Sequence, residues 1–219
     1  FSGFTGVTQI DGLSKLDTSK VENMYSMFYN STSLTSLDLS SFDTSKVTDM
    51  TYMFKNTGYS SEELNLGISK LNTSSVTNMK YMFTGAGHFV NSLNLDLSSF
   101  DTSNVTNMYG MFMGTGRMSN DVSLNVSNFD TSNVTTMAYM FYELGHNSAN
   151  FTLDVSGFDM SKVTDATGMF QYTGHESTVF STSINITNPN VKYTSIFSSA
   201  FSKGNSKMVL NYISETEDV

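Results

Sequence analysis

The chain has 219 residues, of which 38% are hydrophobic and only 14% are charged, and its formal net charge at pH 7 is -9. An acidic surface argues against nucleic acid and anionic lipid as partners, because both are bound by clustered lysine and arginine. The absence of cysteine excludes disulfides, thiolate metal sites and a cysteine nucleophile, and no apolar run approaches the roughly 18 residues of a membrane-spanning helix.

The first residues have the pattern of a repeat that begins in its middle. Phe1 aligns with Phe28, and Ile10 aligns with Leu37 of the following repeat. We therefore expect residues 1–219 to form a single repeat domain that is a fragment of a larger protein.

One motif recurs along the chain, Asp-Thr-Ser-x-Val-x-x-Met-x-x-Met-Phe. Six copies, separated by 26 residues once and by 29 residues four times, begin at Asp17, Asp43, Asn72, Asp101, Asp130 and Asp159. A seventh copy at Asn190 keeps only the apolar positions Phe197 and Phe201. Fixed periods of this length are typical of solenoids, in which each repeat buries its apolar face against its neighbours. The sequence therefore predicts a coil of about seven rungs, a rung being one repeat.

A short run before each motif has the two-residue period of a half-buried strand. In the second repeat Leu37 and Leu39 alternate with Asp38 and Ser40. The alternation returns at Leu93, Leu95, Leu97, Val122, Leu124, Val126, Phe151, Leu153, Val155, Ile184 and Ile186. Stacked repeats would place these runs side by side, so we predict a parallel β-sheet along one face.

The motif itself has the spacing of a short helix. Val47, Met50 and Phe54 lie at i, i+3 and i+7, on one helical face. Asp43 or one of the two residues after it can cap the first turn, and Gly58 can end the last turn. We therefore predict a right-handed α/β solenoid with the sheet on one face and short helices on the other. An all-β coil without helical turns is the alternative.

The C-terminal part departs from the repeat. Pro189 replaces the phenylalanine that precedes most copies of the motif. Residues 202–219 are predicted to form a C-terminal cap, with a strand at 207–213 and then an acidic tail. Terminal repeats are expected to be atypical because solvent covers one of their sides.

Two columns of side chains are expected to build the core. Eleven of the fifteen methionines occupy the two methionine positions of the motif, and the phenylalanine that follows them recurs in every repeat. The phenylalanine column is Phe28, Phe54, Phe83, Phe112, Phe141, Phe170 and Phe201. Tyr109, next to one of these methionines, is expected to face outward.

The strand pattern Leu-x-x-Leu-x-Leu resembles the first half of a leucine-rich repeat. Together with the recurring Phe-Asp-Thr-Ser-Asn-Val-Thr-Asn-Met-x-x-Met-Phe, it makes residues 1 to about 201 similar to the BspA-type leucine-rich repeat surface proteins, a 26-residue repeat family of mycoplasmas and other Firmicutes. The resemblance implies an extracellular protein at the bacterial cell surface with a role in adhesion. The family motif is structural, so no binding residues are transferred from it.

Two surfaces are candidate binding sites. Outward strand positions form a polar sheet face, represented by Asp38, Asn94, Asp96, Asn125, Asp154 and Asn185. The residues after each glycine form a variable loop edge, consisting of Tyr59, His88, Arg117, His146 and His175. Two histidines on adjacent rungs could approach one another, but two ligands without a third are a weak signal for zinc. We predict no metal site and no cofactor.

No catalytic arrangement is visible, and a regular solenoid offers little of the closed pocket that chemistry needs. We therefore expect a monomeric, non-enzymatic adhesion module that contacts a protein or glycan and does not insert into the membrane. A basic or neutral partner suits the charge of -9. The alternative is a passive stalk that holds another domain away from the cell.

Overall fold

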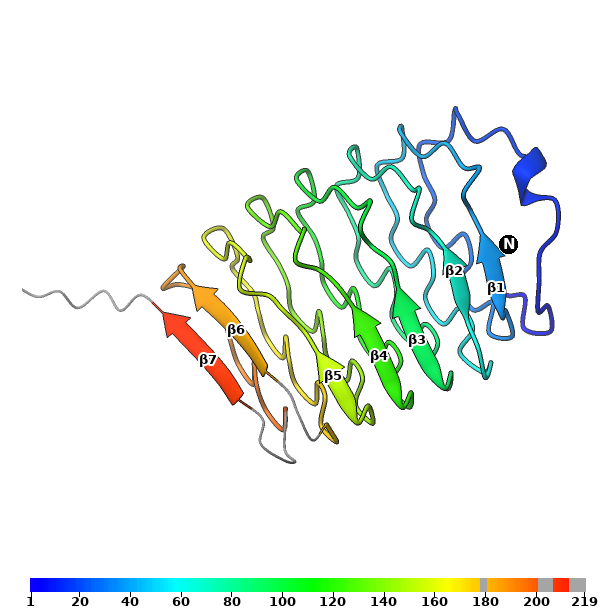
Figure 1. Ribbon diagram of the computed structural model, residues 1–219. Helices are drawn as coiled ribbons and strands as arrows, with labels where there is room; N and C mark the ends of the chain where they lie inside the picture. The colour runs from blue at the N-terminus through cyan, green and yellow to red at the C-terminus, as the bar shows by residue number, and fades with distance from the viewer. Residues whose placement is uncertain (178–180, 201–206, 213–219) are drawn as a thin grey trace, which may run out of the picture.

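The computed structural model describes residues 1–177, 181–200 and 207–212. Within these residues, seven short strands follow one another in chain order and lie side by side along one face (Figure 1). Their bounds are β1 Ser36–Asp38, β2 Asn65–Gly67, β3 Ser92–Leu95, β4 Asp121–Leu124, β5 Asn150–Thr152, β6 Ser181–Ile186 and β7 Lys207–Tyr212. They pair into three small parallel sheets, β1–β2, β3–β4–β5 and β6–β7. The predicted parallel pairing of repeats is thus confirmed for these strands.

Strands pair in a register that matches the repeat. Leu37 lies opposite Leu66, and Leu93 lies opposite Val122. In β3 and β4 exposed and buried residues alternate strictly. Because successive side chains of a strand point to opposite faces, this register keeps the apolar residues of paired strands on the same, buried side.

A second line of parallel contacts joins the rungs away from the strands. Isolated bridges connect each of the following residues to the next one: Asn23, Asp49, Asn78, Asn107, Thr136, Asp165 and Lys192. These residues directly precede the first methionine position of the motif. Hydrogen bonds therefore also join the repeats to one another on the side of each rung away from the strands.

The helices predicted over the motif are absent. Among the described residues the one helical element is η1, a 3-10 turn at Leu13–Lys15. The segment after the motif's first methionine instead forms overlapping β-turns. In the second repeat the Met53 amide donates to the Met50 carbonyl, and the Lys55 amide donates to the Tyr52 carbonyl, both at 3.1 Å. No described helix is long or apolar enough to cross a membrane.

Hydrogen bonds to the neighbouring rung explain why turns replace the helix. The Met50 amide donates to the carbonyl of Asn78, and the Tyr52 amide donates to the carbonyl of Lys80, both at 3.1 Å. Alternate amides thus bond to the next rung, and the amides between them bond within the turns. The φ angles of Tyr52 and Asn56, 58° and 59°, are incompatible with a right-handed helix. A segment this short could not hold a helix by itself, so bonding to the next rung prevails.

The turns preserve the burial that the helical spacing predicted. The first and last residues of a β-turn lie close together, so two residues three positions apart reach the same side in a turn as they do in a helix. Met50 and Met53 are both fully buried, as are Val47 and Phe54. The pattern identified the core correctly and the backbone conformation wrongly.

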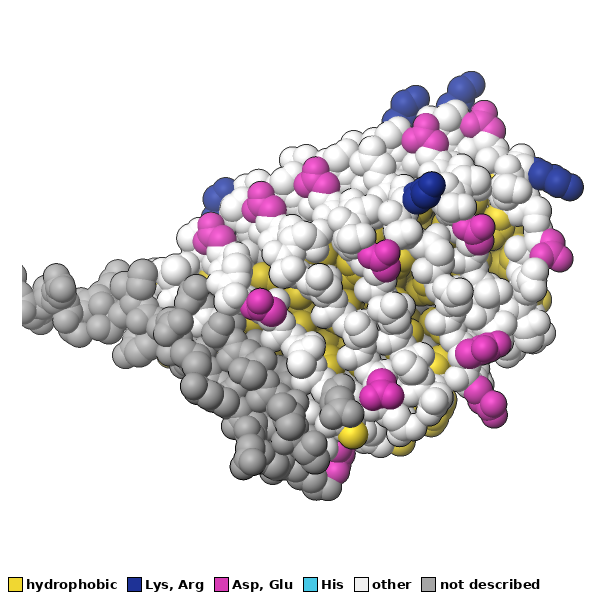
Figure 2. Space-filling model, in the orientation of Figure 1, with side chains coloured by type: hydrophobic (Ala, Val, Ile, Leu, Met, Phe, Trp, Pro, Cys, Tyr) yellow, Lys and Arg dark blue, Asp and Glu magenta, His cyan; other side chains and the backbone are white. Residues whose placement is uncertain are grey.

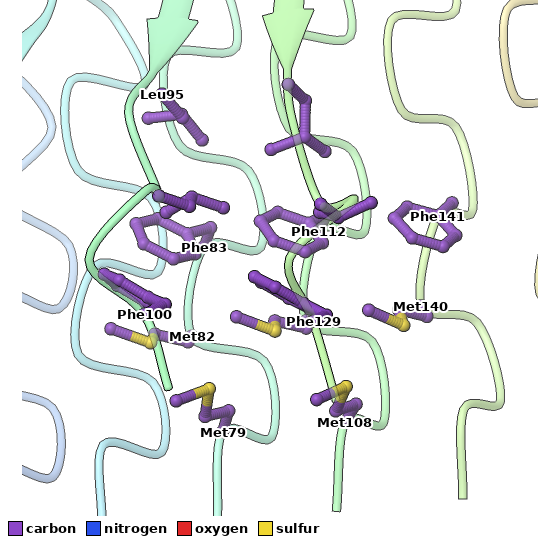
Figure 3. Packing of buried hydrophobic residues seen from close by; sticks show 14 of the residues in the cluster. Met79, Met82, Phe83, Leu95, Phe100, Met108, Phe112, Phe129, Met140 and Phe141 are labelled. Carbon is purple, nitrogen blue, oxygen red and sulfur yellow. The ribbon is translucent and has the colours of Figure 1, made fainter. Parts of the chain in front are cut away.

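Stacked rings run through the core from rung to rung (Figure 3). The rings of Phe83 and Phe112 lie 5.5 Å apart and within 3° of parallel, and those of Phe112 and Phe141 lie 5.8 Å apart and within 1°. Phe1 stacks on Phe28 at 5.6 Å, which confirms the predicted alignment of the first residues. The buried methionines line this column along its length (Figure 3).

The column ends on a different residue from the one predicted. Phe170 stacks on Phe197 at 5.3 Å, and the Phe170 amide donates to the carbonyl of Ile196. Phe197 therefore occupies the position that the sequence alignment assigned to Phe201, which lies outside the described residues. The irregular last repeat is shorter than the alignment assumed, so its apolar positions were offset.

Candidate functional site

The polar sheet face is exposed as predicted. Asp38, Asn94, Asp96, Asn125 and Asp154 are all exposed. Figure 2 shows carboxylates spread over this face, with apolar side chains visible between the uncharged groups, and no histidine is visible on it. Asn185 belongs to β6, but its side chain lies outside the described residues. The face offers many weak polar contacts and no aromatic side chain at these positions.

The acidic residues of this face are engaged in local turns. Oδ1 of Asp154 accepts hydrogen bonds from the amide of Ser156 at 2.9 Å and from its hydroxyl at 2.7 Å. Asn125 is bonded in the same way to Ser127. The two bonds from Ser156 hold the pKa of Asp154 below its usual value. Such Asx turns give these side chains a structural role, which weakens the case for the sheet face as the binding site.

The loop edge is less exposed than predicted. His88 is buried: its ring stacks on Tyr59 at a centroid distance of 4.3 Å and meets Phe89 edge-on at 4.5 Å. Burial lowers the pKa of His88, and the positive charge of Arg117 lowers it further. The histidine is therefore a packed, neutral ring, and the prediction of a free side chain at this position is wrong.

The other loop-edge residues are half-buried and engaged with neighbours. Arg117 forms an ion pair with Glu143 at 2.9 Å. The rings of His146 and His175 stack at 4.8 Å, which confirms that they lie on adjacent rungs. His146 Nδ1 lies 2.7 Å from Asn147 Oδ1, and the described part of the chain holds no group of three or more histidine, cysteine, aspartate or glutamate side chains suited to a metal.

Sequence reasoning missed a continuous row of tyrosine rings over the turns. The tyrosine row consists of Tyr25, Tyr29, Tyr52, Tyr81, Tyr109, Tyr139, Tyr142 and Tyr172, which are half-exposed apart from the exposed Tyr25. The rings of Tyr52 and Tyr81 stack at 5.3 Å, and those of Tyr81 and Tyr109 meet edge-on at 5.0 Å. Further ring contacts of 5.7 to 5.9 Å carry the row to Tyr172.

Backbone geometry places these rings. Tyr52, Tyr81 and Tyr139 have positive φ angles, and glycine stands at the same position in two other repeats, as Gly110 and Gly168. A Cβ atom added to Gly110 would lie 2.5 Å from the ring of Tyr81, and one added to Gly168 would lie 2.7 Å from the ring of Tyr139. Each of these two tyrosines therefore covers a glycine of the next rung.

A shallow hollow opens in the second half of the tyrosine row. It has a volume of about 420 Å³ and is lined by Tyr81, Tyr109, Met113, Tyr139, Tyr142 and Gln171. Burial raises the pKa of the Tyr81 hydroxyl, and a hydrogen bond with Tyr109 adds to the effect. The hollow presents ring faces, hydroxyl groups, a thioether and one amide. These groups suit binding, and they include no nucleophile paired with a base.

Lysines lie over the first half of the same row. Lys55 Nζ lies 5.1 Å from the ring centroid of Tyr52 and 5.4 Å from that of Tyr81. Lys80 Nζ lies 5.3 Å from that of Tyr109. Both lie within the distance at which a cation is attracted to an aromatic face.

A signal for the row was present in the sequence. Tyrosine repeatedly stands next to a core methionine, directly after the first one in Met24-Tyr25 and Met108-Tyr109 and directly before the second one in Tyr52-Met53 and Tyr139-Met140. The tyrosines at these positions are exposed or half-exposed, while the methionines of the motif beside them point into the core. A comparison of the variable positions within the motif would have revealed an aromatic surface.

Comparison with known proteins gives one family. The model of the family described as "Mycoplasma protein of unknown function, DUF285" matches residues 1–123 and again residues 90–209. Two overlapping matches are expected when a repeat model meets a longer array of the same repeat. No curated protein and no solved structure shows significant similarity to the chain. The chain belongs to the DUF285 family of Mycoplasma proteins of unknown function.

Proposed function

We propose that this protein is a non-enzymatic binding module of a bacterial cell surface, built as a BspA-like solenoid of about seven rungs. Support for the solenoid comes from parallel bonding of each repeat to the next and from the continuous phenylalanine stack. Such a coil presents the same positions again and again along a face, so weak contacts add up along an extended macromolecule.

The observation that carries the proposal is the tyrosine row. Tyr52, Tyr81 and Tyr139 adopt the left-handed backbone conformation, which costs an ordinary residue about 1–2 kcal/mol. Glycine at 110 and 168 adopts it without that cost. These large rings are half-exposed, contact one another and occupy positions with a strained backbone. This combination favours a role in recognition. Tyrosine is also among the residues that most often anchor protein interfaces.

A passive stalk is the second candidate, and the Asx turns favour it. The carboxylates of the sheet face serve the turns of their own rungs, as Asp154 does with Ser156. A surface whose polar groups are used internally needs no ligand to explain it. On this reading the tyrosine row only shields the turns, and it binds nothing.

Variants taken from neighbouring repeats can separate these candidates. Tyr139→Gly introduces the residue found at 110 and 168, so it removes a ring without adding backbone strain. A sheet-face variant carries Asp96→Ala and Asp154→Ala, and a loop-edge variant carries His146→Ala and His175→Ala. The parent and the variants would be compared for binding to an array of matrix proteins and glycans, at low and high salt.

The binding module is supported if the parent binds a macromolecule and Tyr139→Gly weakens that binding while the other two variants do not. Loss of binding in the sheet-face or loop-edge variant alone would move the site to that surface. If the parent binds nothing on the array, the stalk is the better account. Equal melting temperatures of parent and variants are the control that the fold is retained.

A further inference from the structure

The two halves of the tyrosine row differ in the groups that cover their rings. In the first half, Lys55 and Lys80 lie over the rings of Tyr52, Tyr81 and Tyr109. In the second half, no lysine or arginine of the described residues lies over the ring of Tyr139, Tyr142 or Tyr172. The same kind of surface therefore carries its own cations at one end and none at the other.

The repeat shows where the missing cations would be. Lys55 directly follows the phenylalanine of its motif, and in later repeats this position holds Met113, Tyr142 and Gln171. Lys80 directly follows the first methionine position of its motif, and in later repeats this position holds Tyr109, Ala138 and Thr167. The hollow is lined on one side by Tyr81 and Tyr109, over which Lys55 and Lys80 lie, and on the other side by Tyr139 and Tyr142. No described lysine or arginine lies over the Tyr139 and Tyr142 rings, so this side of the hollow is an aromatic surface without a cation of its own.

We propose that this hollow binds lysine or arginine side chains of a basic polypeptide partner, whose ammonium or guanidinium groups take the place that Lys55 and Lys80 hold in the first half. This inference rests on the proposed function, since it names the partner of the same tyrosine row. The internal lysines demonstrate the geometry, with nitrogen-to-centroid distances of 5.1 to 5.8 Å.

Charge around the hollow agrees with a cationic partner. The chain carries a net charge of -9, which attracts basic polypeptides over a distance. Arg117 and Glu143 form an ion pair at 2.9 Å, so their charges compensate one another. Burial raises the pKa of Tyr142, Glu143 raises it further and Arg117 lowers it, so both members of the pair act on that ring. A neutral glycan would gain nothing from this charge.

The test uses a short peptide of alternating glycine and lysine and the same peptide with every lysine acetylated. Acetylation keeps the length and removes the charge. The protein contains no tryptophan, and eight of its eleven tyrosines belong to the row, so assigned ring resonances of labelled tyrosine report on the row and tyrosine fluorescence reports on binding. We expect the lysine peptide to bind and to perturb the rings of Tyr139, Tyr142 and Tyr172, and the acetylated peptide not to bind.

Three variants distinguish ring recognition from general attraction to a negative protein. Tyr139→Gly and Tyr142→Gln introduce residues that other repeats carry at these positions, and they leave the net charge unchanged. Each should weaken binding about two- to fivefold, the loss expected for one exposed cation–π contact. Tyr52→Gly is the comparison within the row: Lys55 already lies over that ring, which does not line the hollow, so this variant should weaken peptide binding less than Tyr139→Gly does.

A gain of binding provides the opposite check. Lys55→Gln and Lys80→Thr together remove the internal cations and introduce residues found at these positions in later repeats. The rings of Tyr52 and Tyr81 should then become perturbed by the lysine peptide. This variant also makes the net charge more negative, which can raise the affinity by itself. The measurement is therefore which tyrosine rings the peptide perturbs, and not the total affinity.

The proposal is overturned if the acetylated peptide binds as well as the lysine peptide, or if Tyr139→Gly and Tyr142→Gln bind the lysine peptide like the parent. A glycan or neutral protein that binds and loses affinity in Tyr139→Gly would refute the cationic partner and leave the binding module standing. If neither peptide nor any macromolecule depends on the tyrosine row, both the inference and the proposed function fail.

Discussion

At the scale of single residues, equivalent positions of the motif hold different residues in different repeats, and local geometry explains which residue each position can hold. Tyr81 and Gly110 occupy equivalent positions, and the ring of the first covers the second. Two features favour glycine at 110, its φ of 59°, which other residues adopt at a cost, and the Tyr81 ring, which leaves no room for a Cβ atom. Gly114 has a similar φ of 64° and open space around it, so the two features can be separated.

Gly110→Ala should destabilise the protein more than Gly114→Ala. Both changes place a side chain at positive φ, which costs about 1 kcal/mol or more, but only the first also forces the Tyr81 ring to move. Unfolding in urea would measure the difference. In a Tyr81→Ala background the two glycine variants should become equivalent; a difference that persisted there would show that the ring is not the cause.

Asx turns make a second prediction at this scale. Ser103 donates from its hydroxyl and its amide to Asp101, and these bonds lower the pKa of that carboxyl below 3.8. The unfolded chain therefore binds more protons near pH 4, and the stability that the turn contributes is lost as the pH falls below about 4. Asp101→Asn copies Asn72 of the preceding repeat, which forms the same turn without titrating.

Urea midpoints measured between about pH 6 and pH 3 would test the sign of this effect. The parent should lose stability over this range, and Asp101→Asn should lose less of it. Identical pH profiles would mean that the turn at Asp101 adds nothing to acid sensitivity. The neutral-pH stability of the variant is the control, since it should remain close to that of the parent.

At the scale of the repeated element, the motif behaves as a run of turns with one buried and one exposed side. Met111 and Phe112 are fully buried, and Tyr109 is half-exposed. Phe112 also stacks on the phenylalanine of each adjacent rung. Because alternate amides of the turn segment bond to the next rung, its conformation depends on the neighbouring rungs that the buried side chains hold in place.

Phe112→Ala should therefore destabilise the protein by about 3–5 kcal/mol, the usual cost of deleting a large buried ring. Tyr109→Ala should cost clearly less, because part of that ring remains in contact with water in the folded state. Thermal or urea unfolding measures both. Equal losses at the two positions would contradict the assignment of buried and exposed sides.

At the scale of the whole molecule, each rung contacts mainly the rung before it and the rung after it. Bridges join Asn78 to Asn107 and Asn107 to Thr136, and the phenylalanine stack follows the same order. In such an array stability is roughly a sum over repeats and the interfaces between them. No long-range closure limits the number of rungs.

Inserting a second copy of residues 101–129 after residue 129 should give a folded protein of higher stability. The added rung brings one more interface and buries a further set of methionine and phenylalanine side chains, so both the urea midpoint and the m value should rise. A scrambled copy of the same composition is the control. A lower midpoint for the intact insertion would contradict the additive description of the array.

Much of the fold could be predicted from the sequence alone, because a repeat that recurs every 29 residues shows the same pattern of apolar positions several times. The parallel pairing, the alternation in the strands and the buried columns of methionine and phenylalanine follow from the pattern of apolar positions. That pattern records which side chains avoid water. The pattern therefore predicted the buried phenylalanine column from Phe28 to Phe170 and the methionines that pack beside it.

Only the tertiary structure decided the rest. Met50 and Met53 could reach the core from a helix or from a turn, and the amides of the adjacent rung decided for turns. Burial of His88 depends on the rings of Tyr59 and Phe89, which come together only when rungs stack. The tyrosine row arises in the same way, because its members lie in different repeats. The residues that meet across rungs are separated by a full repeat in the chain, so their contacts are not visible within one repeat and become visible only when the same position is compared across repeats.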